Sequence, residues 1–245
     1  EIKLSIDIKL QRYIEKLLVG KTGSVVAIDP SSGELLAIAS APSFDPNILS
    51  GRDYSKNYKN LQIDTLKPIY NRALTATYPP GSMFKLIQAL IGLEENVVSK
   101  EDQIYVDLSR IGDLAPAGIY DLNKAIVKSS NNYFHMLFRK LINQKRDNNT
   151  FIDSKIGLDR WSEYIKKFGL GSDLDFDISN MSSGFVPSSE YYDGFYGKGR
   201  WKFSNIYSLS IGQGELLVTP IQMANIASII ANRGNYYNPN IVTHI

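Results

Sequence analysis

The segment that most constrains the fold is residues 78–93, where two prolines and a glycine stand directly before an apolar run. Pro79, Pro80 and Gly81 end any regular element upstream. The apolar residues that follow have the spacing of an amphipathic helix, and its expected core face is Phe84, Ile87, Leu90 and Ile91. Ser82 is therefore expected in the first turn of that helix, where unpaired backbone N–H groups point outward.

Ser82 and Lys85 lie three residues apart, so they share one face of the predicted helix. A serine in that place can be acylated, because backbone N–H groups can hold the oxyanion that forms. An amine that is close by and partly desolvated can be neutral and take the serine proton. The alternative interpretation is an N-capping serine beside a solvated lysine. Ser-x-x-Lys occurs once in the chain.

A second polar cluster, residues 128–132, follows a helix that we expect to begin at Leu122 with Asp121 as its N-cap. Within it, a Ser-x-Asn turn would place the Ser129 hydroxyl and the Asn131 carboxamide on one side of a short loop. The hydroxyl can relay a proton between amines, and the carboxamide can hydrogen-bond a peptide group. Ser-x-Asn is a common pattern. It also matches Ser55-Lys56-Asn57 and Ser130-Asn131-Asn132, and a plain N-cap with Asn131 exposed is the alternative.

These motifs and their surroundings resemble the penicillin-binding proteins, the transpeptidases of cell-wall synthesis, and above all their monofunctional elongation enzymes. The resemblance extends from Ile6 to about Ile241. It is carried by Asn71–Leu74, Thr77–Lys85, Ser129–Phe134, Gly157–Trp161, Gly184–Ser188 and Ile206–Pro220. It selects the Ser129–Asn131 frame, because Ser-Ser-Asn followed by Tyr-Phe and a helix is the family's second motif in the expected order.

The resemblance implies an α/β fold in which helices cover both faces of a mainly antiparallel sheet. Ser82 would stand at the start of a central buried helix. Residues 1–245 would form a transpeptidase domain that is incomplete at its C-terminus. The family's third motif, a Lys-Thr-Gly or Arg-Ser-Gly-like triplet, does not occur after Asn131. Lys21-Thr22-Gly23 precedes the serine and is interpreted as a turn. The membrane anchor, the pedestal domain and the last strands of the sheet are expected outside this chain.

The implied function is peptidoglycan D,D-transpeptidation. Ser82 would attack the penultimate D-alanyl carbonyl of a stem peptide ending in D-Ala-D-Ala, and its own N–H would supply half of the oxyanion hole. Lys85 would be the base, Ser129 the proton relay and Asn131 a substrate contact. No metal or organic cofactor is expected, because protein groups complete the acyl chemistry. β-Lactam antibiotics would remain bound to Ser82 as stable esters.

The family also implies partners and a location. A lipid II glycosyltransferase and membrane proteins of the elongation complex are the expected partners. The enzyme is expected at the cytoplasmic (inner) membrane, with its catalytic domain on the periplasmic, extracytoplasmic side.

Two alternatives stay open at this point. A serine β-lactamase or β-lactam sensor shares Ser-x-x-Lys, and turnover of a chromogenic cephalosporin would distinguish it. A catalytically silent wall-assembly module that only binds partners is the second alternative, kept open by the missing third motif.

Composition excludes several other classes. The net charge of +2 gives no reason to expect nucleic acid, and the absence of cysteine removes thiol nucleophiles, disulfides and cysteine-bound metals. Two histidines are too few for a metal site. No window approaches 18 apolar residues. A phosphate-binding loop ending in Gly20-Lys21-Thr22 would need a glycine at position 15, which is Glu15.

The other expected elements come from periodicity and caps. A strand over residues 2–6 and a helix capped by Asp7 open the chain, and residues 24–29 and 34–40 should form a hairpin. A short strand is expected at 104–107, a helix at 161–168, and a helix that begins with Thr219-Pro220 and ends at Gly234. Loops or exposed insertions are expected at 41–77, 108–120, 143–156 and 188–200.

Overall fold

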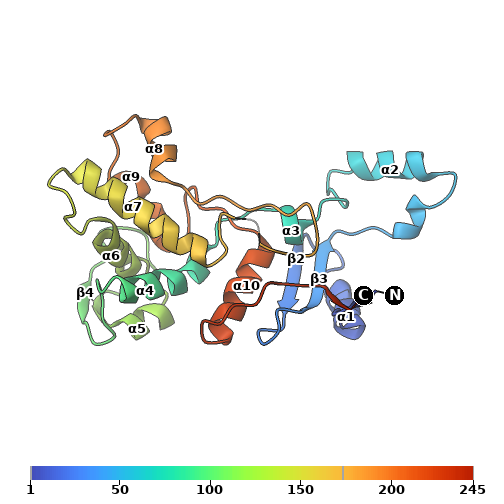
Figure 1. Ribbon diagram of the computed structural model, residues 1–245, viewed down its shortest axis with the longest axis horizontal. Coiled ribbons are helices and arrows are strands. Elements are labelled where there is room, and N and C mark those ends of the chain that lie inside the picture. Colours follow the sequence, from blue (N-terminus) through green and yellow to red (C-terminus); the bar gives the residue numbers. More distant parts are fainter. Residues whose placement is uncertain (1, 173, 245) are drawn as a thin grey trace. The chain divides into compact units, whose positions relative to one another are not determined.

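The structure, a computed structural model, describes residues 2–172 and 174–244 (Figure 1). The chain divides into two compact units. The first unit comprises Glu1–Tyr78, Ser172–Gly184 and Val218–Ile245, and the second comprises Pro79–Gly171 and Phe185–Leu217. Ser82, Lys85, Ser129 and Asn131 all belong to the second unit.

The first unit is built on the antiparallel hairpin of β2 (Gly23–Ile28) and β3 (Leu35–Ala41) (Figure 1). One face of the hairpin, with Ala37 and Ala39, packs on α1 (Ile8–Leu17). The opposite face, with Val26, packs on α3 (Arg72–Thr75) and α10 (Pro220–Ala231). Because successive strand residues point to opposite faces, the hairpin packs against helices on both of its faces.

Two helix starts in this unit follow from their capping residues, as predicted. The Asp7 carboxylate accepts the backbone N–H groups of Lys9 and Leu10 at 2.8 and 3.1 Å. Thr219 and Gln222 form a reciprocal capping box at the start of α10, with Pro220 at its first position. These bonds satisfy N–H groups that the helix itself leaves unpaired.

The predicted α/β class is confirmed. Among the described residues, the strands form three two-stranded antiparallel ladders: β1 (Lys3–Leu4) with β6 (Val242–His244), β2 with β3, and β4 (Ile104–Val106) with β5 (Gly118–Tyr120). The strand β5 and the helix α2 (Tyr54–Ile63) both fall in segments predicted as loops, so those two predictions were wrong. The sequence did not indicate α2 because this helix has no buried face and no side-chain cap, so it shows no amphipathic pattern.

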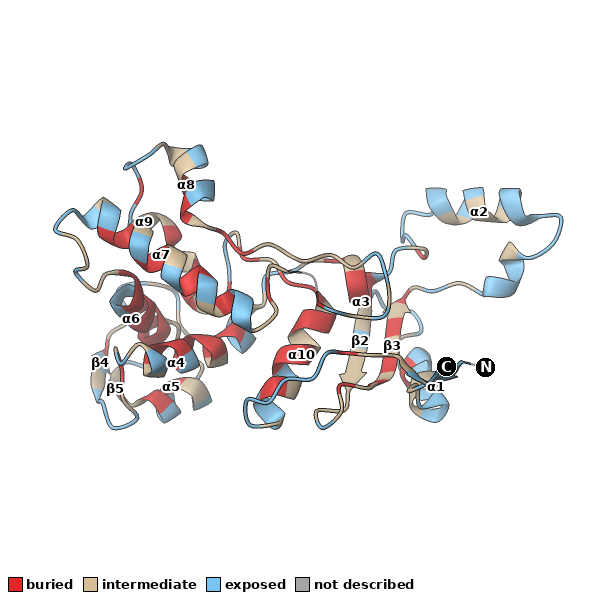
Figure 2. Cartoon of the chain, in the orientation of Figure 1, coloured by how far each residue is buried: buried red, intermediate tan, exposed pale blue. Residues whose placement is uncertain are grey.

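The second unit is mainly helical. Its helices are α4 (Lys85–Glu94), α5 (Leu122–Val127), α6 (Asn131–Ile142), α7 (Thr150–Lys167), α8 (Ser189–Tyr196) and α9 (Phe203–Ile206). Figure 2 shows buried residues gathered on α4, α6 and α7. Edge-to-face contacts join Trp161 of α7 to Phe84 and to Phe138 of α6. Such pairs add to the apolar burial and fix the orientation of the rings.

Two further loop predictions fail in this unit. The presumed insertion at 143–156 contains the first turns of α7, with Asp153 and Ser154 buried. The Asp153 carboxylate accepts the N–H groups of Lys145 and Arg146, so it organises the turn before the helix. The segment at 188–200 contains α8, capped by Ser188. Both segments contain buried polar side chains with hydrogen-bond partners: Asp153 accepts backbone N–H groups, and the Ser189 hydroxyl donates to Asp159. Hydropathy does not reveal such burial.

The core face predicted for α4 needs one correction. Leu90 is exposed, whereas Gln88 is fully buried. The Gln88 carboxamide accepts the indole N–H of Trp161 at 2.7 Å. A buried Trp needs a partner for its N–H, and the amide supplies it where a leucine could not.

Candidate active site

Ser82 lies in a single 3₁₀ turn, Gly81–Phe84, that leads directly into α4. The serine is therefore one turn before the helix rather than within it, and it is exposed. The Gly81 N–H donates to the carbonyl of Gly212 at 2.8 Å. Gly212 has φ +69°, and a Cβ there would lie 2.4 Å from the Gly81 oxygen. This turn is thus held by an approach that only glycine permits.

Lys85 is the first residue of α4, and only 2% of its surface is exposed. Its Nζ donates to Oδ1 of Asn131 at 2.6 Å. It also donates to the backbone oxygen and to Oγ of Ser129, at 2.6 and 3.0 Å. The structure thus brings together three of the four residues expected from the sequence.

Burial lowers the pKa of Lys85 to about 8, against the opposing charge of Asp113. An amine with that pKa is neutral in a substantial fraction of molecules near neutral pH, so it can serve as a general base. The backbone N–H of Lys85 donates to the Ser82 carbonyl, but no hydrogen bond joins the Ser82 hydroxyl to the Lys85 amine within the described part of the chain. In enzymes without bound substrate, catalytic hydrogen bonds are often long, and they tighten in the complex.

The geometry distinguishes the Ser129–Asn131 frame from the two competing Ser-x-Asn frames. Ser129 has φ +50°, an uncommon conformation for serine, and directs both its oxygens to Lys85. Ser130 is instead the N-cap of α6, with its hydroxyl accepting the Tyr133 N–H. Ser55 lies in α2, in the first unit. The frame that faces the lysine is Ser129 with Asn131.

Asp113 organises this site, and our sequence analysis did not identify it. Its Oδ2 accepts from Ser130 Oγ and from the Asn132 N–H, each at 2.9 Å. Its Oδ1 accepts the Ala115 N–H at 3.0 Å. Burial acts to raise the pKa of Asp113, but the hydrogen bonds from Asn132, Ala115 and neighbouring groups outweigh it and lower that pKa.

Asn131 and Asn132 complete the connection between this loop and α6. Asn131 Nδ2 donates to the carbonyl of Gly112, which turns its Oδ1 toward Lys85. Asn132 Oδ1 accepts the N–H groups of Arg110 and Ile111. The two carboxamides and Asp113 thus hold the segment after β4 against the start of α6.

Other expectations concern groups away from these residues. His135 is buried against Phe203 and Tyr207. Over residues 2–172 and 174–244, no group of three or more His, Asp or Glu side chains is arranged to hold a metal ion. No described helix is both long and apolar enough to span a bilayer.

Comparisons with known proteins agree with this geometry. The model of the penicillin binding protein transpeptidase domain matches residues 23–245. Peptidoglycan D,D-transpeptidase MrdA of Haemophilus influenzae is 33% identical over 254 residues, which are 100% of this chain and 37% of that protein. The chain thus spans little more than a third of that relative's length.

Two solved structures are similar to the whole fold. Penicillin-binding protein 2 of Pseudomonas aeruginosa, in complex with WCK 5153, has a TM-score of 0.83 at 33% identity, covering 99% of this chain and 54% of that one. The complex of penicillin-binding protein 2 with MreC from Helicobacter pylori has a TM-score of 0.84 at 26% identity, covering 99% and 44%.

Proposed function

Because the chain belongs to the penicillin binding protein transpeptidase family, we propose that it catalyses peptidoglycan D,D-transpeptidation through an acyl-enzyme at Ser82. One observation carries the proposal. The buried Lys85, whose pKa is lowered to about 8, follows the exposed Ser82 by one turn and is held by Ser129 and Asn131. That arrangement supplies a nucleophile, a base and a proton relay in one place.

In the first half-reaction, Ser82 Oγ attacks the penultimate D-alanyl carbonyl carbon, and neutral Lys85 takes the serine proton. The new ester bond forms as the C–N bond to the terminal D-alanine breaks. The proton passes from Lys85 through the Ser129 hydroxyl to the leaving amine. The backbone N–H of Ser82 is one donor to the transient oxyanion.

In the second half-reaction, an amine from a neighbouring strand attacks the ester carbonyl. Lys85 and Ser129 accept its proton and return one to Ser82 Oγ as the serine leaves. Asn131 shares its carboxamide between Lys85 and the carbonyl of Gly112. It is therefore held beside the lysine, where it would meet the peptide groups of the substrate.

The similarity to MrdA supports a role in cell elongation. The solved complex of a similar protein with MreC supports elongation-complex membrane proteins as partners, and a lipid II glycosyltransferase is the second partner we propose. We place the catalytic domain, residues 1–245, on the periplasmic side of the cytoplasmic membrane, where the stem peptides are.

The test is intact-protein mass spectrometry after incubation with benzylpenicillin. We expect the native chain to gain one benzylpenicilloyl adduct and Ser82→Ala to gain none. Ser55→Ala is the matched control, because Ser55 belongs to the competing Ser-x-Asn motif, and it should be acylated like the native chain. An adduct that survives Ser82→Ala would refute the assignment. Fast turnover of a chromogenic cephalosporin would instead favour the β-lactamase alternative.

A further inference from the structure

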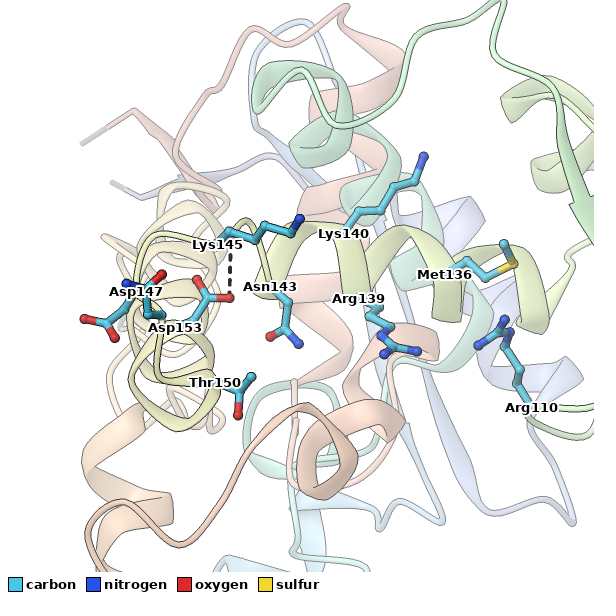
Figure 3. A pocket seen from close by; sticks show the side chains of 10 residues that line it. Arg110, Met136, Arg139, Lys140, Asn143, Lys145, Asp147, Thr150 and Asp153 are labelled. Carbon is cyan, nitrogen blue, oxygen red and sulfur yellow. Dashed lines mark hydrogen bonds between the residues drawn. The ribbon is translucent and has the colours of Figure 1, made fainter.

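A basic groove lies beside α6 in the second unit (Figure 3). It consists of two hollows, of ≈ 620 and ≈ 480 Å³, that share Arg110, Arg139, Asn143 and Thr150. We call it the basic groove and define it by its six cationic or titratable members: Arg110, His135, Arg139, Lys140, Lys145 and Lys202. These residues come from the loop after β4, from α6 and the turn that follows it, and from the residue before α9.

Among the described residues, no carboxylate that lines the basic groove forms a salt bridge with these cations. Asp153 is occupied by the backbone N–H groups of Lys145 and Arg146, and Asp147 accepts the N–H of Asn149. The salt bridges found among the described residues are Arg146–Glu95, Lys155–Asp193 and Arg160–Glu95, and none of them uses a member of the groove. Asp107 and Asp102 act on Arg110 and Lys140 from farther away.

A buried group without a partner lies in the same groove. His135 lines the second hollow, only 8% of its surface is exposed, and its Nδ1 makes no hydrogen bond to any described residue. Burial lowers its pKa, and the charges of Arg110 and Arg139 lower it further. Buried polar atoms normally have partners, so an unpaired one inside a cationic hollow indicates a place for a ligand oxygen.

The basic groove is linked to the proposed catalytic centre by a hydrogen bond and by the shared helix α6. Its first member, Arg110, donates its backbone N–H to Asn132, the neighbour of Asn131. Arg139 follows Asn131 by eight residues on α6, which is roughly 12 Å along the helix axis at ~1.5 Å per residue. An extended peptide spans this separation of roughly 12 Å with about four residues.

We propose that the basic groove binds the carboxylate groups of an acidic peptide. This proposal rests on the proposed function in one respect, namely that the peptide is part of the substrate processed at Ser82. Guanidinium groups bind carboxylates and phosphates alike through paired hydrogen bonds. The cations are spread over two hollows, which suits several carboxylates along an extended chain better than one compact phosphate.

The experiment titrates the full chain with triglutamate, with triglutamine as the neutral matched peptide and inorganic phosphate as a competitor. We expect triglutamate to bind, and Arg110→Glu and Arg139→Glu each to weaken binding about tenfold or more. Lys166→Glu is the control, because this exposed α7 lysine lines neither hollow. A measurement on the native chain needs no variant: triglutamate should raise the pKa of His135 in NMR titrations, since a bound anion stabilises the imidazolium.

The outcomes are distinct. The groove proposal would be overturned by any of three results. Triglutamate affinity could fall equally in Lys166→Glu, triglutamine could bind as tightly as triglutamate, or the pKa of His135 could stay unchanged on addition of triglutamate. Displacement of triglutamate by millimolar phosphate would overturn the acidic peptide in favour of a phosphate-bearing ligand. Benzylpenicillin acylation, measured on the same samples, separates the two proposals. Acylation without triglutamate binding refutes the groove alone, and binding without acylation refutes the function at Ser82 while the groove stands.

Discussion

Asp113 Oδ2 accepts a hydrogen bond from Ser130 Oγ at 2.9 Å, so a carboxylate in an irregular loop holds the residue that caps α6. Ser130 stands between Ser129 and Asn131, which both accept hydrogen bonds from Lys85. Asp113 therefore acts on the proposed catalytic residues in two ways: it fixes their backbone, and its charge raises the pKa of Lys85 against the effect of burial.

Replacement of Asp113 by Asn should move the pH profile of acylation. The loss of the negative charge removes a stabiliser of protonated Lys85, so the inflection should fall below about pH 8. The free energy of unfolding should also fall by about 1–3 kcal/mol, because hydrogen bonds to a charged acceptor are weakened. Acylation rate against pH and chemical denaturation are the measurements.

Asp107→Asn is the matched control for this change. Its carboxylate accepts from the N–H and hydroxyl of Ser109 in an exposed turn. It should leave the inflection where the native protein has it. A profile for Asp113→Asn that falls in amplitude without moving would mean that Asp113 acts by fixing structure alone.

The pH dependence of acylation in the native protein should report Lys85 directly. The rate of acylation by benzylpenicillin should rise with pH and level off above an inflection near pH 8, because the neutral amine is the base. Lys85→Met should abolish this rise and slow acylation at least ~100-fold. A rate that is flat from pH 6 to 9 in the native enzyme would contradict the role of Lys85.

The same group has a consequence for stability. The pKa of Lys85 is about 8 in the folded state and has its ordinary value of 10.5 when unfolded. Between these values the unfolded chain binds more protons, so the contribution of Lys85 to the free energy of unfolding grows as pH rises through this window. In Lys85→Met this contribution should vanish, and thermal unfolding from pH 8 to 10 checks it.

Gly212→Ala should disturb the turn that carries Ser82. The new Cβ would lie 2.4 Å from the Gly81 oxygen and 2.6 Å from the Phe84 Cβ, so the turn must shift. Gly199→Ala is the control, because Gly199 has a similar φ of +68° but nothing within 4 Å of its Cβ. Both should lose ~1 kcal/mol to left-handed strain, whereas only Gly212→Ala should lose acylation. Equal acylation rates in the two variants would show that the turn tolerates the contact.

Gln88→Leu should destabilise the second unit although it increases apolar content. It leaves the indole N–H of Trp161 buried without its acceptor, which costs about 1–3 kcal/mol. Gln103→Leu, at an exposed position, should change the free energy of unfolding by less than ~0.5 kcal/mol. Chemical denaturation of both variants is the measurement, and a Gln88→Leu protein as stable as the native one would contradict the role of this bond.

The parts of the site that the sequence predicts are those carried by local spacing. Ser82 and Lys85 are one helical turn apart, and two prolines before them define where the turn begins. The capping residues Asp7, Asp121 and Thr219 likewise act within three residues, and their helices begin where expected. Periodicity alone was less reliable, since Leu90 was placed in the core and is exposed.

The missed features depend on contacts between distant residues. Asp113 lies in a turn-rich loop, and its partner Ser130 is seventeen positions away, so no local pattern marks it. Gln88 is buried because Trp161, seventy-three positions later, needs an acceptor. The Tyr-rich segment that forms α8 packs by Tyr192 against Trp201. Such pairings become visible only when the chain is folded.

The backbone conformation of Ser129 is unfavourable for stability, whereas its hydroxyl is needed in the proposed mechanism. A glycine would adopt its φ of +50° without strain, so Ser129→Gly should make the protein slightly more resistant to heat. The same change would delete the hydroxyl that faces Lys85. Under the proposed mechanism, screens for thermostable variants would therefore tend to recover a protein without the Ser129 proton relay, whereas screens for acylation would retain the strained serine.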